Sequence, residues 1–210
     1  MADILPAFPL SLVAFPGEEV NLHIFEPRYK QLFLECEAKG ITFAILPSFD
    51  GVDSEYATEM ELVKIAKTYP DGKMDVMTKG VGLCKVMTYF DRHPNKLYPA
   101  VEFEKLAWSD HSDLILNLEI LELVGTLYET MNVDNVEIKS EADFRTYQIA
   151  HKVGMTQSQE LEFLSINDER SRQLYMLDHL QKLIPVVEEM EVMRQRAAMN
   201  GHFKNVLPMK

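Results

Sequence analysis

Apolar and polar residues alternate in short runs over the first hundred positions, the pattern typical of half-buried β-strands. The first run covers residues 10–14 and leads to Pro16-Gly17, where a fixed φ followed by a residue tolerant of positive φ predicts a tight turn. A second run covers residues 20–24. Further runs predict strands over 41–46, 62–68, 74–78, 83–89 and 100–103.

Turn-forming residues mark the breaks between these strands. Asp71-Gly72 is the clearest hairpin turn. Gly80 and Gly82 predict a bulge or a sharp bend between the two strands that flank them. The segment 47–57 is rich in acidic residues and is expected to form an exposed loop.

One helix is predicted within this β-rich half. It is expected to begin at Pro27, because the missing N–H of proline would have no partner in the first helical turn. Gly40 stands where a left-handed C-cap would end it. Apolar residues recur at i, i+3, i+4 and i+7 and form one stripe of Tyr29, Leu32, Phe33 and Cys36.

After Trp108 the apolar period becomes helical. A first helix is expected from about Ser112. The segments 140–143 and 156–159 have the S-x-x-D and T-x-x-Q patterns of capping boxes, in which side chains satisfy the first free N–H groups of a helix. They predict two further helix starts.

A long final helix is predicted after Asn167, which is a suitable N-cap. Pro185 lies inside this segment and is expected to kink the helix, because proline removes one backbone hydrogen bond. Its apolar residues recur every three or four positions and comprise Leu174, Leu177, Leu180, Ile184, Val187, Met190 and Met193.

These patterns predict an α+β fold. A compact, mostly antiparallel β unit with one packed helix is expected over residues 1–108, followed over 109–210 by a helical bundle that ends in the long helix. With 210 residues, of which 47% are apolar, the chain can bury a substantial core.

The charge of the chain disfavours two classes of binding partner. The 33 acidic and 21 basic residues give a net charge of −12, which repels phosphate backbones and anionic membranes, and no basic patch offsets it. We therefore expect neither nucleic acid nor a membrane as a partner.

The sequence has no apolar run of about 20 residues and no signal-peptide pattern at its start, so a cytoplasmic location is expected. Cys36 and Cys84 lack metal-ligand spacing and are expected to be buried, reduced thiols.

Two segments near the start carry a family resemblance. They are Phe8-Pro9-Leu10-Ser11-Leu12-Val13-Ala14-Phe15-Pro16-Gly17 and Leu22-His23-Ile24-Phe25-Glu26-Pro27-Arg28-Tyr29. Together they resemble the start of the N-terminal substrate-recognition domain of Lon-family ATP-dependent proteases. Weaker similarities are the Asp71-Gly72 hairpin followed by Gly80, and the helical ending from Ile149-Ala150 to Arg170, Leu174 and Leu177.

The resemblance implies a PUA-like β pseudobarrel packed against a helical subdomain. In that family the domain binds unfolded polypeptide substrates and, in the full protease, helps the hexamer to assemble. The sequence departs from the family at 80–84, where the family often has a basic and an aromatic residue after its glycine. Because the resemblance is to the recognition domain alone, the chain is expected to lack the ATPase and protease domains of that family.

Sequence motifs for catalysis are missing. A Lon ATPase needs a P-loop of the form G-x-x-x-x-G-K-[ST], and the one Gly-Lys pair, Gly72-Lys73, is followed by Met74. No H-E-x-x-H is present, and no motif suggests an activated cysteine. Glu188-Glu189 is most simply a solvated helix face. We predict no catalytic residues, no cofactor and no metal site.

Seven residues are candidates for polypeptide binding, and those of the β-rich half also have a structural explanation. A charged residue beside a helix start often fixes the strand-to-helix joint, and thioethers suit an irregular core as well as a promiscuous surface. The two methionines of the final helix are a different case, because a helix longer than its bundle needs a covering partner. The candidates are His23, Phe25, Arg28, Met74, Met77, Met190 and Met193.

Two functions follow as hypotheses. The first is a binding module with an apolar groove between the β unit and the bundle, which captures unfolded polypeptides as an adaptor or modulator of a separate ATP-dependent protease. The second is an assembly protein that forms a homodimer through its final helix. An enzyme with unrecognised chemistry ranks third, because it would need a cleft of convergent titratable groups.

Overall fold

The computed structural model describes residues 3–107, 109–133 and 140–203, with side chains described up to residue 198. Its contacts divide the chain into two compact units. The first contains the β-strands, α1 and the segment Met155–Asp168, and the second contains Asp110–Gly154 and the residues from Glu169 onward. The change of pattern in the sequence divides the chain at residue 108 and so assigns Met155–Asp168 to the helical half. The contacts of this segment instead group it with the β unit. Trp108 itself lies outside the described residues.

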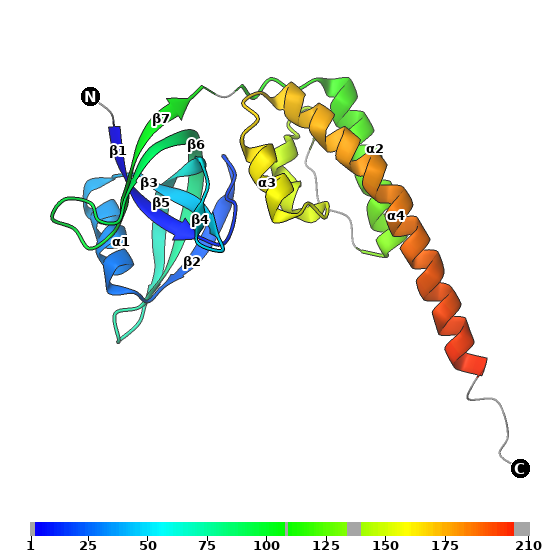
Figure 1. The fold of residues 1–210 in the computed structure, drawn as a ribbon, viewed down its shortest axis with the longest axis horizontal. Coiled ribbons are helices and arrows are strands. Elements are labelled where there is room, and N and C mark those ends of the chain that lie inside the picture. Colours follow the sequence, from blue (N-terminus) through cyan, green and yellow to red (C-terminus); the bar gives the residue numbers. More distant parts are fainter. Residues whose placement is uncertain (1–2, 108, 134–139, 204–210) are drawn as a thin grey trace, which may run out of the picture. The chain divides into compact units, whose positions relative to one another are not determined.

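The first unit is a closed, mostly antiparallel sheet (Figure 1). Neighbouring strands run β1-β7-β6-β5-β3, and a parallel pairing of β1 with β3 closes the ring. This arrangement confirms the β-rich half of the expected α+β fold. The strands are β1 (Asp3–Leu10), β2 (Glu19–Ile24), β3 (Phe43–Phe49), β4 (Val52–Asp53), β5 (Tyr56–Thr68), β6 (Met74–Phe90) and β7 (Ala100–Leu106).

The first strand differs from the prediction. β1 ends at Leu10, so the predicted strand over 10–14 is wrong. Four consecutive residues of β1 are buried, because its two faces contribute to different core clusters, Phe8 to one and Leu5 and Ala7 to the other. This pattern leaves no alternation to detect. The turn at Pro16-Gly17 is confirmed, with Gly17 at φ +85°.

β6 is one strand where the sequence predicted two. The predicted bulge lies at Gly80 and Gly82, where the register with β5 shifts between Glu59 and Met60. A Cβ on Gly80 would lie 2.4 Å from the carbonyl oxygen of Phe15, because the segment before β2 crosses directly over this glycine. β6 pairs with β5 on both sides of the bulge, with β2 over its first half and with β7 over its second half.

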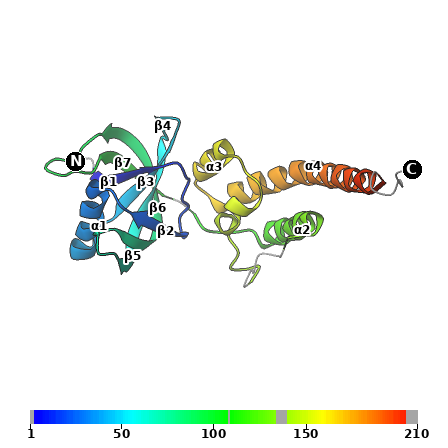
Figure 2. The same ribbon diagram turned by 90° about the horizontal axis from the view of Figure 1, so that it is seen from below.

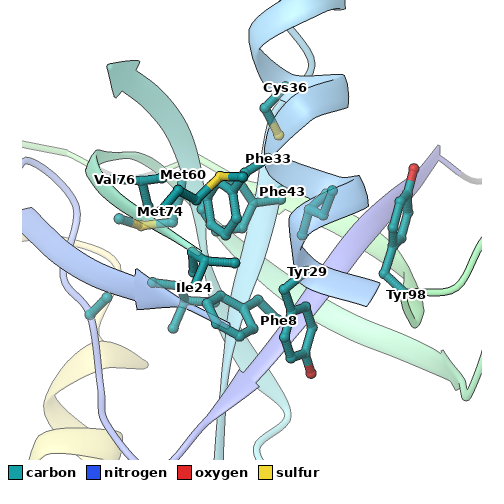
Figure 3. Close-up of a cluster of buried hydrophobic side chains, with 13 residues drawn as sticks. Phe8, Ile24, Tyr29, Phe33, Cys36, Phe43, Met60, Met74, Val76 and Tyr98 are labelled. Atoms are coloured by element: carbon teal, nitrogen blue, oxygen red, sulfur yellow. The ribbon is translucent and has the colours of Figure 1, made fainter. Parts of the chain in front are cut away.

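The helix α1 (Pro27–Lys39) is confirmed at both ends. It begins at the predicted proline, and Gly40 caps it at φ +64°. The ring of Phe8 lies 4.1 Å from that of Tyr29, and the rings of Phe33 and Phe43 are 5.1 Å apart, measured between centroids (Figure 3). The buried residues of α1 are the predicted stripe of Tyr29, Leu32, Phe33 and Cys36.

The helix α3 (Gln157–Leu164) belongs to the first unit. It opens with the predicted capping box, in which Thr156 accepts from the N–H of Gln159 and the Gln159 side chain accepts from the N–H of Thr156. Its residue Phe163 is buried, and the ring lies edge-on to Phe15 at 6.0 Å between centroids.

The second unit pairs α2 (Leu114–Met131) with α4 (Glu169–Phe203), as Figure 2 shows from below. The Asp113 side chain caps α2 by accepting from two backbone N–H groups. The Nε2 of Gln173 on α4 donates to the carbonyl of Asp113 and to the side-chain oxygen of Asn117 on α2. α4 continues through Pro185, which does not end the helix.

The helix predicted from residue 140 is wrong. This segment forms turns and two short 3₁₀ turns, η1 (Thr146–Gln148) and η2 (Ala150–Lys152). Side chains of the two long helices occupy its backbone groups: Asn117 donates to the carbonyl of Glu141, and Glu169 accepts from the N–H of Thr146. These bonds replace the internal bonds that an α-helix would need.

The buried stripe of α4 contains polar residues that an apolar pattern misses. Leu174, counted in the predicted stripe, is half exposed. Arg172 and Glu169 are fully buried, and Arg172 Nε donates to Glu169 Oε2 at 2.9 Å while its guanidinium lies 4.3 Å from the centre of the Tyr147 ring. The buried residues of the α4 stripe are Glu169, Arg172, Gln173, Met176, His179, Leu180 and Ile184.

Candidate functional site

Three of the sequence-predicted residues lie together on the outer side of β2 and β6. The antiparallel register places His23 opposite Asp75, and Asn21 opposite Met77. Because directly opposed residues point to the same face of a sheet, these side chains form one surface. Phe25 follows β2 and its ring stacks on that of His23, with 6.4 Å between centroids. We call this surface the β2 face; it comprises His23, Phe25, Tyr69, Asp75 and Met77.

Hydrogen bonds fix the polar part of the β2 face. His23 Nδ1 lies 2.6 Å from Asp75 Oδ1, and the Tyr69 hydroxyl donates to Asp75 Oδ2 at 2.7 Å. The hydrogen bond from His23, followed by that from Tyr69, lowers the pKa of the Asp75 carboxyl. The rings of His23 and Tyr69 meet edge to face at 5.8 Å. The network therefore holds two aromatic rings in fixed positions at the surface.

Apolar surface surrounds this network. Phe25 is 59% exposed, which is unusual for a side chain of this size, and Met77 is half-buried beside the network. The ammonium of Lys67 lies 4.3 Å from the centre of the Tyr69 ring. Exposed rings with a thioether and few fixed polar groups suit the binding of varied side chains rather than a reaction.

Two other candidates, Arg28 and Met74, make contacts that stabilise the fold and lie outside the β2 face. Arg28 Nε donates to Glu26 Oε2 at 2.8 Å, and its guanidinium lies 4.6 Å from the centre of the Tyr29 ring, so both contacts are made within the first turn of α1 and its N-cap. Met74 is buried in the core cluster of Figure 3. The structure therefore places Arg28 at the helix joint and Met74 in the interior, away from the β2 face.

Met190 and Met193 belong to α4 in the second unit, whereas the β2 face belongs to the first. They are 64% and 57% exposed. From Pro185 to Ala198 no residue of α4 is buried in the structure. The described side chains after Ile184 therefore leave a stretch of helix whose apolar residues face solvent.

A polar cluster around Glu35 was missed by the sequence patterns. Lys96 Nζ lies 2.6 Å from Glu35 Oε2 and Lys39 Nζ lies 2.9 Å from the same oxygen. The hydroxyl of Tyr98 donates to it at 3.3 Å. The cluster borders a cavity of about 460 Å³ whose wall also includes Thr42. Only the Glu35–Lys39 pair, four residues apart on a helix, could have been anticipated.

The protein's identity rests on a comparison with known families. The family model of the ATP-dependent protease La (LON) substrate-binding domain matches residues 4–193. The chain belongs to this family. The match is to the substrate-binding part of that protease, which is not its catalytic part. It confirms the resemblance of the opening segments and extends it over most of the sequence.

Two solved structures have the fold of this Lon substrate-binding domain. A Lon N-terminal domain protein from Xanthomonas campestris superposes with a TM-score of 0.64 at 22% identity, covering 84% of this chain and 98% of the other. The N-terminal domain of a Mycobacterium avium complex Lon protease gives a TM-score of 0.63 at 13% identity, covering 85% and 98%. At these identities the likeness shows the fold.

Among the described residues, no group of three or more His, Cys, Asp or Glu side chains could hold a metal ion. Both cysteines are buried free thiols, and burial raises the pKa of each to about 12. None of the helices that the structure describes is long and apolar enough to cross a membrane.

The Glu35 cluster makes stability depend on pH. Hydrogen bonding to Lys96 is the largest cause that lowers the pKa of Glu35, to about 2 from an ordinary value of 4.5. The resulting stabilisation is complete above the unfolded-state pKa and is lost as the pH falls through 4.5 towards 2. Glu35→Gln should therefore lower the free energy of unfolding at neutral pH and flatten its decline in acid. Urea unfolding at several pH values checks this, and an equal decline in both proteins would contradict it.

Proposed function

We propose that this Lon substrate-binding domain binds unfolded polypeptide segments through the β2 face without catalysing a reaction on them. The observation that carries the proposal is the exposed ring of Phe25, stacked on a histidine that Asp75 holds in place. Family membership supplies the substrate class, because the matched model describes a substrate-binding domain. The net charge of −12 favours segments with apolar and basic side chains over acidic ones.

A substitution at Phe25 tests the surface. Phe25→Ser removes the largest exposed apolar area of the β2 face and should weaken binding of a labelled unfolded polypeptide about tenfold, as expected for a central aromatic contact. Val52→Ser is the matched control, because Val52 on β4 is also strongly exposed but lies outside the β2 face. Fluorescence anisotropy measures both. Equal affinities of the two variants would place binding elsewhere.

We further propose that the bound segment reaches a separate ATP-dependent protease, with this domain as adaptor or modulator. The family description supports this role, since the matched domain belongs to such a protease. The two free thiols agree with a reducing compartment such as the cytoplasm. A protease assay with and without the domain, using one unfolded substrate, would test the adaptor role.

The second candidate function is self-assembly through α4. Val186, Met190 and Met193 are exposed at positions i, i+4 and i+7, and Ala197 continues the stripe. The spacing is the same read in either direction. Two antiparallel copies would thus place Met190 opposite Met193 and Val186 opposite Ala197, as in an antiparallel coiled coil. The same alignment brings Glu189 of one copy beside Arg196 of the other.

Assembly is tested by sedimentation velocity over a range of concentrations. Met190→Ser with Met193→Ser should shift a concentration-dependent dimer to monomer, because the central layers lose their apolar contacts. Leu174→Ser is the control, since Leu174 is an exposed leucine near the start of the same helix. A monomer at every concentration of the unsubstituted protein would rule out this candidate.

A further inference from the structure

β2 is an edge strand in an otherwise closed sheet. It pairs with β6 on one side, and among the described residues no strand pairs with its other side. Among the described strands, each of the five ring strands pairs with at least two others, whereas β2 and the two-residue β4 each pair with one, so β2 is the longer of these two edge strands. Figure 2 shows β2 beside β6. An edge strand offers unpaired backbone groups to an extended chain.

Hydrogen bonds at Gly80 show which groups face outward. The Gly80 N–H donates to the Glu18 carbonyl, and the Gly80 carbonyl accepts from Gly17, so Gly80 points towards the β2 side. In an antiparallel ladder every second residue points the same way. Thr78 and Val76 therefore also point towards β2, to their register partners Val20 and Leu22. The alternate residues of β2, Asn21 and His23, direct their N–H and C=O groups to the open edge.

The side chains beside this edge favour one kind of occupant. Outward-facing His23 and Phe25 offer rings on one side of the strand, and Val20 and Leu22 on the other side are only half-buried. An added strand would cover apolar surface on both sides of β2 with alternate residues. The chain has a net charge of −12, which favours basic over acidic residues in the added strand.

We infer that an extended segment of an unfolded polypeptide, with alternating apolar and basic residues, adds to β2 as a further strand. The inference rests on the proposed function and specifies its mode of binding. Backbone hydrogen bonds from Asn21 and His23 supply affinity that depends little on sequence. A folded protein offers few extended segments with unpaired backbone groups, so strand addition predicts a preference for unfolded chains.

Asn21→Pro tests the inference on the protein side. Proline removes the outward N–H at position 21 and leaves the inward bonds of Val20 and Leu22 to β6 in place, as prolines do on natural edge strands. Asn21→Ala is the matched control, because it removes the same side chain and keeps the N–H. With a labelled peptide of alternating valine and lysine, we expect Asn21→Pro to bind about tenfold more weakly than Asn21→Ala.

N-methylated peptides provide a second test on the unsubstituted protein. Two versions of the valine–lysine peptide carry backbone N-methyl groups on alternate residues, in opposite registers. A strand seated on β2 directs only one set of its N–H groups towards the protein, so one version should lose binding and the other should keep it. This result does not depend on the folding of any variant.

The outcomes distinguish failure of strand addition to β2 from failure of the proposed binding of unfolded polypeptides. Equal affinities of Asn21→Pro and Asn21→Ala, or of the two methylated peptides, would overturn strand addition while the unmodified peptide still binds. Failure of the unsubstituted protein to bind either the peptide or an unfolded protein would overturn both strand addition and the proposed function. Loss of binding by one methylated peptide and by Asn21→Pro supports both.

Discussion

Gly80→Ala is expected to lower the free energy of unfolding of the β unit by about 2–4 kcal/mol. The added Cβ would lie 2.4 Å from the Phe15 carbonyl oxygen and 3.1 Å from the Pro16 Cα, distances that only a backbone shift can relieve. Such a shift would disturb the hydrogen bonds of Gly80 with Gly17 and Glu18, which hold the start of β2 against β6.

Gly82→Ala is the matched control for this prediction. Its Cβ would lie 3.2 Å from Glu59 Oε2, the end of a flexible side chain that can move away. A loss of about 1 kcal/mol or less is expected. Urea unfolding followed by circular dichroism measures both variants. Similar losses at the two glycines would show that the crossing of residues 15–17 over β6 is not the controlling contact.

Arg172→Met is expected to destabilise the second unit by about 3–5 kcal/mol. The substitution leaves the Glu169 carboxylate fully buried without its cation, which Arg172 Nη2 approaches at 2.9 Å. Burial already raises the pKa of Glu169, against the opposing effects of the Thr146 N–H and Arg172. The loss of the guanidinium should raise this pKa further.

The double variant Glu169→Gln with Arg172→Met separates the lost ion pair from lost packing. Glutamine keeps an acceptor for the Thr146 N–H and carries no charge, so the double variant should recover much of the stability that Arg172→Met loses. Thermal and urea unfolding provide the four free energies of a double-mutant cycle. Additive losses would show that the pair contributes no coupling and would contradict this account.

The elements that could be predicted from sequence are those whose signals are local. Pro27 and Gly40 fix the ends of α1 through their own backbone preferences, and Thr156 and Gln159 cap α3 over a span of three residues. The Asp71-Gly72 hairpin is another local signal, with Gly72 at φ +74°. None of these depends on the remainder of the fold.

The elements that could not be predicted depend on distant residues. β1 gives no alternation because both of its faces are buried, Phe8 in one core cluster and Leu5 and Ala7 in another. The segment after Ser140 is held by Asn117 and Glu169 rather than by its own helix. Arg172 occupies a position on the buried stripe of α4 where helical periodicity predicts an apolar residue. A single sequence contains no signal for such tertiary hydrogen bonds.

The candidate site shows the same limit. His23 and Phe25 stand out in the sequence because they precede a clear helix start, yet their partner Asp75 is 52 residues beyond His23. Only the β2–β6 register brings the two together and separates the outward Met77 from the buried Met74. An apolar residue on a strand can be called binding or core only when its face is known.

The most direct test of the central claim is a binding titration with one substrate in two states. A fluorescently labelled protein is prepared both in its native form and as a permanently unfolded variant, and each is titrated with this domain while anisotropy is recorded. We predict saturable binding of the unfolded form alone, unaffected by ATP. Absence of binding to the unfolded form well above micromolar concentration, or equal binding to both forms, would contradict the proposal that this domain recognises unfolded polypeptides.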